Sequence, residues 1–383
     1  MFVLALFARA DISSSWLDPS CLRELTGCKM TSARVSKIGI IYALLSAVLF
    51  GASTPYSKLL LSSASPLMMA GLLYIGAGFG LALVHFSRRA LGSPEIEAPL
   101  RKSDLGWLAL VILAGGVCGP LLLMFGLSQT PASGTALLLN LEGLATMVIA
   151  WTVFHENVDL RLLIGAGAIL AGAILISWQG KASFQWGAFF VAGACLCWGI
   201  DNNLTRKLSS SDPVQIAMLK GLVAGAVNTS LALVQGSSLP RIGTGASITL
   251  VGFFGYGVSL MLFVFALRHL GTARTGAYFS LAPFIGAALS VVLLHDPMSL
   301  RLIAGGGLMA VGLWFHLSER HEHVHVHQAF EHEHSHIHDE HHQHSHVAGD
   351  PPGEPHTHVH RHEPMVHKHP HYPDLHHRHT HAE

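Results

Sequence analysis

Residues 135–172 read TALLLNLEGLATMVIAWTVFHENVDLRLLIGAGAILAG, and residues 275–312 read TGAYFSLAPFIGAALSVVLLHDPMSLRLIAGGGLMAVG. Each stretch consists of an apolar run, a short polar turn that opens with a histidine and an acid, and a second apolar run. An ungapped offset of 140 pairs the following positions: Thr135 with Thr275, His155 with His295, Glu156 with Asp296, Arg161 with Arg301 and Gly165 with Gly305. Chance similarity between apolar segments does not explain matched polar turns, so the sequence predicts an internal repeat.

The composition places these apolar runs in a membrane. The chain of 383 residues is 50% hydrophobic and 12% charged, whereas soluble globular proteins carry about 25% charged residues. The runs are continuous rather than alternating and are long enough to cross about 30 Å of hydrocarbon as helices. The predicted spans are residues 38–60, 66–86, 104–127, 132–154, 160–178, 185–205, 213–235, 245–267, 272–294 and 300–317. We therefore expect an all-α integral membrane protein with ten transmembrane helices.

A second match divides these ten spans into two halves. At an offset of 148, Phe50 to Lys58 align with Trp198 to Arg206. Residues 37–178 and 185–317 are then two repeats of five helices each. Because five is odd, equivalent helices cross the membrane in opposite directions, which is the inverted repeat that secondary transporters use for alternating access.

The basic residues predict the orientation. Twelve Lys and Arg residues lie in the connections on the side of the N-terminus, and four lie on the other side. Because basic residues favour the cytoplasmic side, we expect both termini in the cytoplasm and the chain in the cell inner (plasma) membrane. Residues 1–36 are predicted to be an N-terminal cytoplasmic arm, within which residues 1–29 are equally well explained as a mis-called start.

Glu142 is the first candidate for a transport residue. It lies about ten residues into the fourth span, near mid-membrane at about 1.5 Å per residue, and shares a helical face with Thr135 and Thr146. An ionisable side chain inside a span costs several kcal/mol unless it is paired or hydrated. Glu142 is therefore predicted to be a protonatable or substrate-binding carboxylate in a central cavity. The alternative is a neutral, hydrogen-bonded glutamate that ties helices together.

Asp201 and Lys220 form the second candidate group. They lie at similar depth near the cytoplasmic ends of the sixth and seventh spans. A structural salt bridge and a pair that opens and closes as a gate explain them equally well. Asn140, Asn202 and Asn228 are expected to add polar lining to the transport path.

The sequence resembles the EamA domain of the drug/metabolite transporter superfamily. The resemblance is carried by AVLFGASTPYSKLLL at 47–61, by the stretch at 135–172, and by CWGIDNNLTRKLSSSDPVQIAMLKG at 197–221. It covers about 280 residues and implies a duplicated five-helix unit that exports or facilitates passage of small organic molecules. The family's glutamate after the fourth span matches Glu156, with Asp296 as its repeat mate. The arginine that the family often has in the second span is absent, and Lys220 fills the corresponding place in the seventh.

The last 63 residues have a different composition. Residues 321–383 hold 23 of the 28 histidines together with several prolines, so we expect a disordered cytoplasmic tail. Neutral imidazole is a ligand for nickel, zinc, cobalt and copper, and metal binding is favoured over a solubilising or pH-responsive role. The predicted ligands are His321, His323, His325, His327, His332, His334, His336, His338, His341, His342, His344, His346, His356, His358 and His360.

Two functions follow from these features. The first is a secondary transporter, an exporter of small organic metabolites or drug-like solutes, whose tail senses or buffers divalent metal ions. The second is an efflux transporter for nickel, cobalt or zinc, which is disfavoured because the spans contain few His, Asp or Cys residues. The sequence contains no phosphate loop or catalytic constellation, so we expect no enzyme, no required cofactor and no nucleic-acid partner. The expected partners are the lipid bilayer, a small-molecule solute and metal ions at the tail.

Overall fold

The computed structural model forms a bundle of long helices. It describes residues 28–90, 100, 104–154, 158–180, 183–205, 208, 212–270 and 272–317, and the tail segments 321–327, 331–336, 356–361 and 365–371. Within these residues, nine helices are long and apolar enough to cross a membrane, which confirms an all-α membrane protein. The helix over the predicted sixth span is not among the nine. It is twenty residues long and ends at Thr205, and Asp201, Asn202 and Asn203 near its end lower its mean hydropathy.

The first half contains five rods, two of which are segmented. They are α2 (Cys28–Leu60), α3 (Pro66–Ala90), the series α4 (Leu105–Val111), η2 (Ile112–Cys118) and α5 (Gly119–Gln129), the pair α6 (Ala132–Leu138) and α7 (Leu141–Phe154), and α8 (Leu160–Ser177). Helix α2 begins at Cys28, so residues 28–36, predicted to be part of an arm, belong to the first helix. The rest of that predicted arm, residues 1–27, lies outside the described residues.

The second half follows the same order. Its rods are α9 (Trp186–Thr205), α10 (Pro213–Val234), the series α11 (Ile242–Gly252), η4 (Phe253–Val258) and α12 (Ser259–Leu270), the pair α13 (Thr272–Phe279) and α14 (Ala282–Leu294), and α15 (Leu300–Leu317). A short hairpin of β1 (Trp178–Gly180) and β2 (Ser183–Phe184), which the sequence analysis did not predict, connects the halves.

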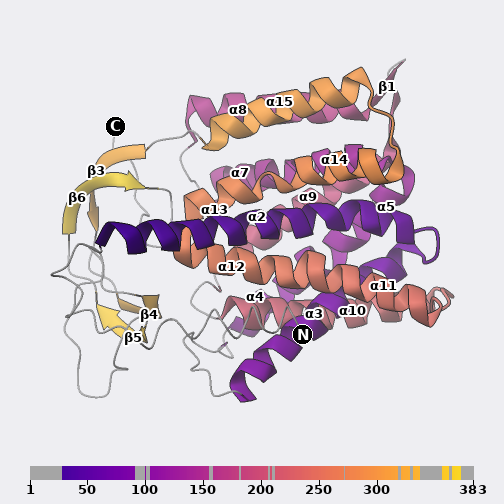
Figure 1. The fold of residues 1–383 in the computed structure, drawn as a ribbon. Helices are drawn as coiled ribbons and strands as arrows, with labels where there is room; N and C mark the ends of the chain where they lie inside the picture. Colours follow the sequence, from indigo (N-terminus) through magenta and orange to yellow (C-terminus); the bar gives the residue numbers. More distant parts are fainter. Residues whose placement is uncertain are drawn as a thin grey trace.

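The two halves interlock. Helix α8 packs on α15 at one edge of the bundle, and α3 packs on α10 (Figure 1). Between them α2 lies against α12 and α14, while α9 lies against α5 and α7. The start of α2 and the end of α15 lie at the same end of the bundle (Figure 1). The most extensive helix pairs therefore each join one half to the other.

Glycines bring α8 and α15 into close contact. A Cβ added at Gly165 would lie 2.7 Å from the carbonyl oxygen of Gly312, and a Cβ added at Gly172 would lie 2.6 Å from that of Gly305. Side chains other than hydrogen do not fit at these separations, which is how small residues let helices approach in lipid. The two contacts are reciprocal, because the offset of 140 relates Gly165 to Gly305 and Gly172 to Gly312.

Two kinds of helix irregularity occur at matching places in the halves. The third and eighth spans each contain a π-helical segment, η2 and η4. The fourth and ninth spans, predicted as single helices over 132–154 and 272–294, are each interrupted, between α6 and α7 and between α13 and α14. At the first interruption, the Asn140 amide donates to the Leu137 carbonyl (2.8 Å) and competes with the helical hydrogen bonds. At the second, Pro283 supplies no backbone N–H at the start of α14.

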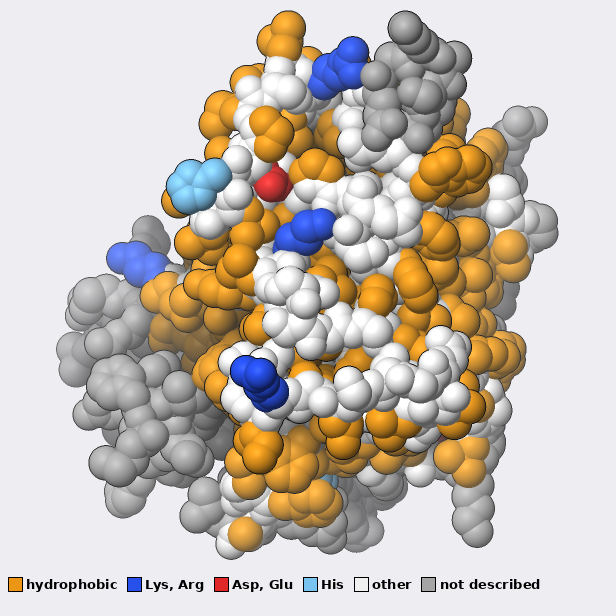
Figure 2. All heavy atoms as spheres, turned by 90° about the vertical axis from the view of Figure 1, so that its right-hand side faces the viewer, with side chains coloured by type: hydrophobic (Ala, Val, Ile, Leu, Met, Phe, Trp, Pro, Cys, Tyr) orange, Lys and Arg blue, Asp and Glu red, His pale blue; other side chains and the backbone are white. Residues whose placement is uncertain are grey.

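Among the described residues, few charged side chains are visible at the end of the bundle that carries the hairpin (Figure 2). Figure 2 shows hydrophobic side chains around its margin, and uncharged polar and backbone atoms with a few charged side chains towards its centre. An apolar margin around a polar centre is the arrangement expected for a bundle that stands across a lipid bilayer.

Four segments of the tail are strands where disorder was predicted. Strand β3 (His321–His327) pairs antiparallel with β6 (Met365–His371), and β4 (Glu331–His336) pairs antiparallel with β5 (His356–Arg361). The cause lies in the sequence, because histidine at every second position has the two-residue period of an extended strand. The predicted ligands His338, His341, His342, His344 and His346 lie outside the described residues.

Candidate functional site

The carbonyl of Gly115, in η2, is the meeting point of three spans. It accepts a hydrogen bond from the Tyr74 hydroxyl of α3 (2.9 Å) and another from the Trp198 indole of α9 (3.0 Å). A Cβ added at Gly115 would lie 2.7 Å from the Cβ of Asp201. Glycine is therefore required here for the close approach of α9.

Asp201 and Lys220 form a buried ion pair beside this glycine. The Lys220 ammonium donates to Asp201 Oδ2, and the Thr205 hydroxyl donates to Oδ1 (3.2 Å). The two side chains are 6% and 18% exposed, so neither charge has enough solvent to be stable without the other. This pair joins α9 to α10 and lies against the third span.

Glu142 lies at the helix interruption of the fourth span. It is in the first turn of α7, where the positive end of the helix dipole favours a carboxylate. Its Oε1 accepts from the Asn202 amide (3.0 Å), which also donates to the Thr146 hydroxyl (3.2 Å). The Thr146 hydroxyl in turn donates to the backbone carbonyl of Glu142 (2.9 Å). These contacts tie the start of α7 to the end of α9.

These two groups belong to one cluster, because Asn202, which donates to Glu142, directly follows Asp201 in α9. With Glu142 ionised, the cluster holds two carboxylates and one ammonium. It also holds spare acceptors: the side-chain oxygens of Asn203 and Asn228 are buried and have no hydrogen-bond partner in the described part of the chain. The cluster is therefore short of hydrogen-bond donors and positive charge, and suits a proton or a ligand that donates hydrogen bonds.

An aromatic row borders the cluster. The ring of Tyr74 packs on Tyr256, with centroids 5.8 Å apart, and Tyr256 packs on Phe50 at 5.7 Å. Phe50 also contacts Phe279, next to the second helix interruption, at 5.4 Å. These rings join the two halves and offer apolar surface beside the polar groups.

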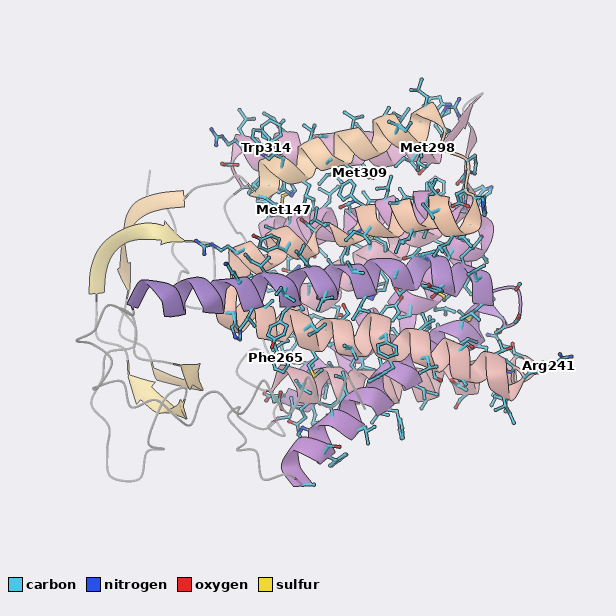
Figure 3. All side chains as sticks on the ribbon, in the orientation of Figure 1. Met147, Arg241, Phe265, Met298, Met309 and Trp314 are labelled. Atoms are coloured by element: carbon cyan, nitrogen blue, oxygen red, sulfur yellow. The ribbon has the colours of Figure 1, made fainter. Side chains whose placement is uncertain are left out.

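Three predicted site residues have contacts of their own. Thr135 is in α6, before the interruption, and its hydroxyl bonds to that of Thr130 (2.6 Å) rather than sharing the contacts of Glu142. The interruption breaks the helical face that was expected to join the two. Asn140 is buried and contacts Met309 Sδ at 3.9 Å, and Figure 3 shows Met309 between the α8–α15 pair and the helices beside it. The Asn228 amide donates to the carbonyl of Gly116 in η2 (3.3 Å).

Gly115, Tyr74 and Trp198 belong to the site but were not predicted from the sequence. Each is neutral and lies in an apolar span, where an aromatic residue or a glycine is usually a packing residue. The double glycine at 115–116 was the one available signal, because such pairs allow close backbone approach.

Asp296 has a contact that its position in a loop did not reveal. Its Oδ2 accepts from the backbone N–H of Ser133 (2.8 Å), so a residue of the second half caps α6 of the first. Nearby, the Lys58 ammonium donates to the carbonyls of Leu127 (2.5 Å) and Thr130 (2.8 Å), at the end of α5. We call Lys58, Asp296 and the turn between α5 and α6 the hairpin-end clamp. The repeat mate of Asp296, Glu156, lies outside the described residues.

Metal ligands could also lie in the helices rather than in the tail. Among residues whose side chains the structure describes, no three His, Cys, Asp or Glu side chains are placed to hold an ion. The metal-ligand prediction thus depends on the tail.

Comparison with known proteins agrees with this architecture. The model of the EamA-like transporter family matches residues 37–178 and 185–318. An uncharacterized transporter of Methanothermobacter thermautotrophicus is 28% identical over 316 residues, which cover 78% of this chain and 92% of that relative. The uncharacterized inner membrane transporter YedA of Escherichia coli is 22% identical, over 68% of this chain and 84% of YedA. A solved crystal structure with 16% identity superposes with a TM-score of 0.53 over 74% of this chain and 95% of that one, and so shares the fold. The chain belongs to the EamA-like transporter family.

Proposed function

We propose that this protein is a secondary transporter that exports small organic metabolites or drug-like solutes. Ten spans form two inverted five-helix repeats, 37–178 and 185–317, in the inner membrane. The observation that carries the proposal is the cluster of Glu142, Asp201 and Lys220 beside interrupted helices. Interrupted helices at equivalent places in two halves are the usual location of a transporter's binding site.

Reciprocal contacts support the inverted arrangement. The offset of 140 replaces Gly165 by Gly305 and Gly312 by Gly172. Exchanging the halves therefore turns the Gly165–Gly312 contact into the Gly172–Gly305 contact. The contact of Gly115 with Asp201 likewise has its counterpart in that of Gly255 with Ser53, where an added Cβ would lie 2.6 Å from the serine Cβ. Such pairs are expected of two copies related by a twofold axis. That axis lies in the membrane plane if the copies are inverted.

Glu142 is assigned the role of coupling residue. A carboxylate near the membrane centre whose hydrogen-bond donor is a neutral amide can take up a proton and release it. The Lys220 ammonium is already paired with Asp201, so it does not hold Glu142 in the ionised state. The aromatic row of Tyr74, Tyr256 and Phe50 supplies the apolar contact of an organic solute. Asp201 and Lys220 keep the cluster polar, and Asn202, Asn228 and Thr146 contribute hydrogen bonds.

The sidedness is assigned from charge. The two ends of the helical part lie at one end of the bundle, and the basic connections favour that end as the cytoplasmic one. The tail then lies in the cytoplasm, where its histidines bind nickel, zinc, cobalt or copper and sense or buffer them. Affinity falls as the pH drops through about 6.5, because protons compete for imidazole.

Efflux of a divalent metal is the second candidate function. The observation in its favour is the histidine tail directly after α15. Against it, the described side chains of the spans show no group of metal ligands, and a metal path across the membrane needs successive ligands.

The test is a comparison of cells that lack the gene with cells that overexpress it. We measure secreted metabolites and cellular nickel, cobalt and zinc, with wild type, Glu142→Gln and Asp212→Asn. Asp212 caps α10 through Val214 N–H (2.8 Å), apart from the cluster, and is the matched control. Export of organic solutes that is lost in Glu142→Gln and kept in Asp212→Asn supports the proposal. A change confined to the metals supports the second candidate, and export by Glu142→Gln at the wild-type level makes that carboxylate structural.

A further inference from the structure

The four tail strands pair in a nested order. The first strand pairs with the last, β3 with β6, and the second with the third, β4 with β5. Segments more than thirty residues apart in the sequence, such as 321–327 and 365–371, therefore lie beside each other. The pairing determines which histidines can share an ion.

The register of both ribbons opposes histidine with histidine. Directly opposed positions are His321 with His371, His323 with His369, and His325 with His367 in the β3–β6 ribbon, and His332 with His360, His334 with His358, and His336 with His356 in the β4–β5 ribbon. The intervening positions hold other residues, for example Val324 opposite Lys368 and Glu333 opposite Val359. Each ribbon is thus a ladder of three histidine rungs.

The spacing of such rungs suits a tetrahedral ion. Opposed residues of an antiparallel pair share one face of the ribbon, with Cβ atoms about 4.5–5.5 Å apart. The next rung is two residues along, at about 3.4 Å per residue. One rung places two histidine positions opposite each other and two neighbouring rungs bring four together, and four is the number of protein ligands that a structural zinc ion takes.

We propose that the two histidine ladders are two separate sites for divalent transition metals of the zinc type, each formed by distant parts of the tail. The inference rests on the proposed metal binding by the tail and makes it specific: the ladder position of a histidine, rather than the number of histidines, determines tight binding. Binding of an ion would lock the register, because a shift of one residue moves every histidine of a strand to the other face.

The ladder and a flexible tail differ in how many tight metal sites are lost when histidines are substituted. Substituting His321, His323 and His325 by alanine removes one side of the outer ladder, and substituting His367, His369 and His371 removes the other. Each triple variant, and the sextuple variant that combines them, should lose the same single tight site. In a flexible tail the losses would add in proportion to the number of histidines removed.

The experiment uses the full chain in detergent, titrated with zinc against a competing chelator near neutral pH. The matched control replaces three histidines outside the ladders, His376, His377 and His379, and should keep both tight sites. Equal loss in the two triple variants and the sextuple variant supports the ladder. Additive loss, or equal loss in the control, overturns it and leaves metal binding by the tail intact. Absence of zinc binding to the wild-type chain overturns both, while the export assay reports independently on transport.

A cross-linking experiment tests the register itself. In a chain whose native cysteines have been replaced, V324C/K368C joins directly opposed positions of the outer ribbon. With oxidised glutathione as the oxidant, zinc should accelerate disulfide formation in this pair at least several-fold and leave the pair V324C/V359C, from different ribbons, unchanged. Equal rates for the two pairs in the presence of zinc would contradict the proposed register.

Discussion

Gly115 determines how closely the sixth span approaches the third. Its carbonyl accepts hydrogen bonds from Tyr74 and Trp198, and the absence of a side chain leaves room for Asp201. A glycine with these three contacts holds the cluster in place without taking part in its chemistry.

Gly115→Ala should therefore destabilise the protein. The added Cβ would lie 2.7 Å from the Cβ of Asp201, and an overpacked core costs about 1–3 kcal/mol. Gly106→Ala in the same span meets no atom within 4 Å and should be neutral or slightly stabilising, since alanine favours a helix. Thermal unfolding in detergent measures both. An unchanged midpoint for Gly115→Ala would show that α9 moves away without cost.

The Asp201–Lys220 pair should behave as a coupled unit. Asp201→Asn and Lys220→Met each leave a buried charge without its partner, which costs about 3–5 kcal/mol. The double variant removes both charges and should be more stable than either single variant. A double-mutant cycle on unfolding measures the coupling, and simple additivity would mean that the two charges are not coupled in the native state.

The charged candidates could be predicted from the sequence because a charge is costly in an apolar span. Glu142, Asp201 and Lys220 were identified on that ground alone. Their neutral partners could not be found in this way, because Trp198 and Tyr74 differ little in a sequence from residues that only fill space. Which atoms meet at Gly115 depends on the packing of three spans.

At the scale of helices, the spans were predicted to within a few residues except for the start of α2, which lies ten residues earlier than predicted. The interruptions were not predicted. The predicted 160–178 and 300–317 compare with α8 at Leu160–Ser177 and α15 at Leu300–Leu317. The length of a hydrophobic segment predicts where a helix crosses a membrane. The segment stays hydrophobic across an interruption, so the interruption gives no signal in hydrophobicity. Pro283 was a signal in the sequence for the break before α14. The break at Asn140 was not, because it depends on the hydrogen bond from the Asn140 amide to the Leu137 carbonyl, which only the structure shows.

The hairpin-end clamp should contribute to the start of α6. Asp296→Ala removes the acceptor for the Ser133 N–H and should cost about 0.5–2 kcal/mol, as the loss of a helix cap does. Asp296→Asn keeps an oxygen acceptor and should recover most of that stability. Met298→Ala, in the same loop and 66% exposed (Figure 3), is the control. Unfolding midpoints compare the three, and equal loss in the Asn and Ala variants would contradict capping.

For the whole molecule, the proposed ten spans and cytoplasmic termini predict alternating sides. Reporter fusions after Leu61 and Gln129 should read outside, and fusions after Ala90 and Ser318 should read inside. The result depends most on α9, whose polar end sets it apart from the nine apolar helices. If α9 did not cross, fusions before and after it would read on the same side.

The reciprocal glycine contacts have an evolutionary consequence. Two surfaces that meet through exchanged pairs, as Gly165 with Gly312 and Gly172 with Gly305 do, are what a homodimer forms across its axis. Under the proposed arrangement, the duplicated chain descends from a five-helix protein that paired with a second copy of opposite orientation. In that ancestor each cluster position occurred twice. Here the offsets place Ala282 opposite Glu142 and Ser53 opposite Asp201, so fusion of the two copies allowed them to differ, with an acid at one position of each pair and a neutral residue at the other.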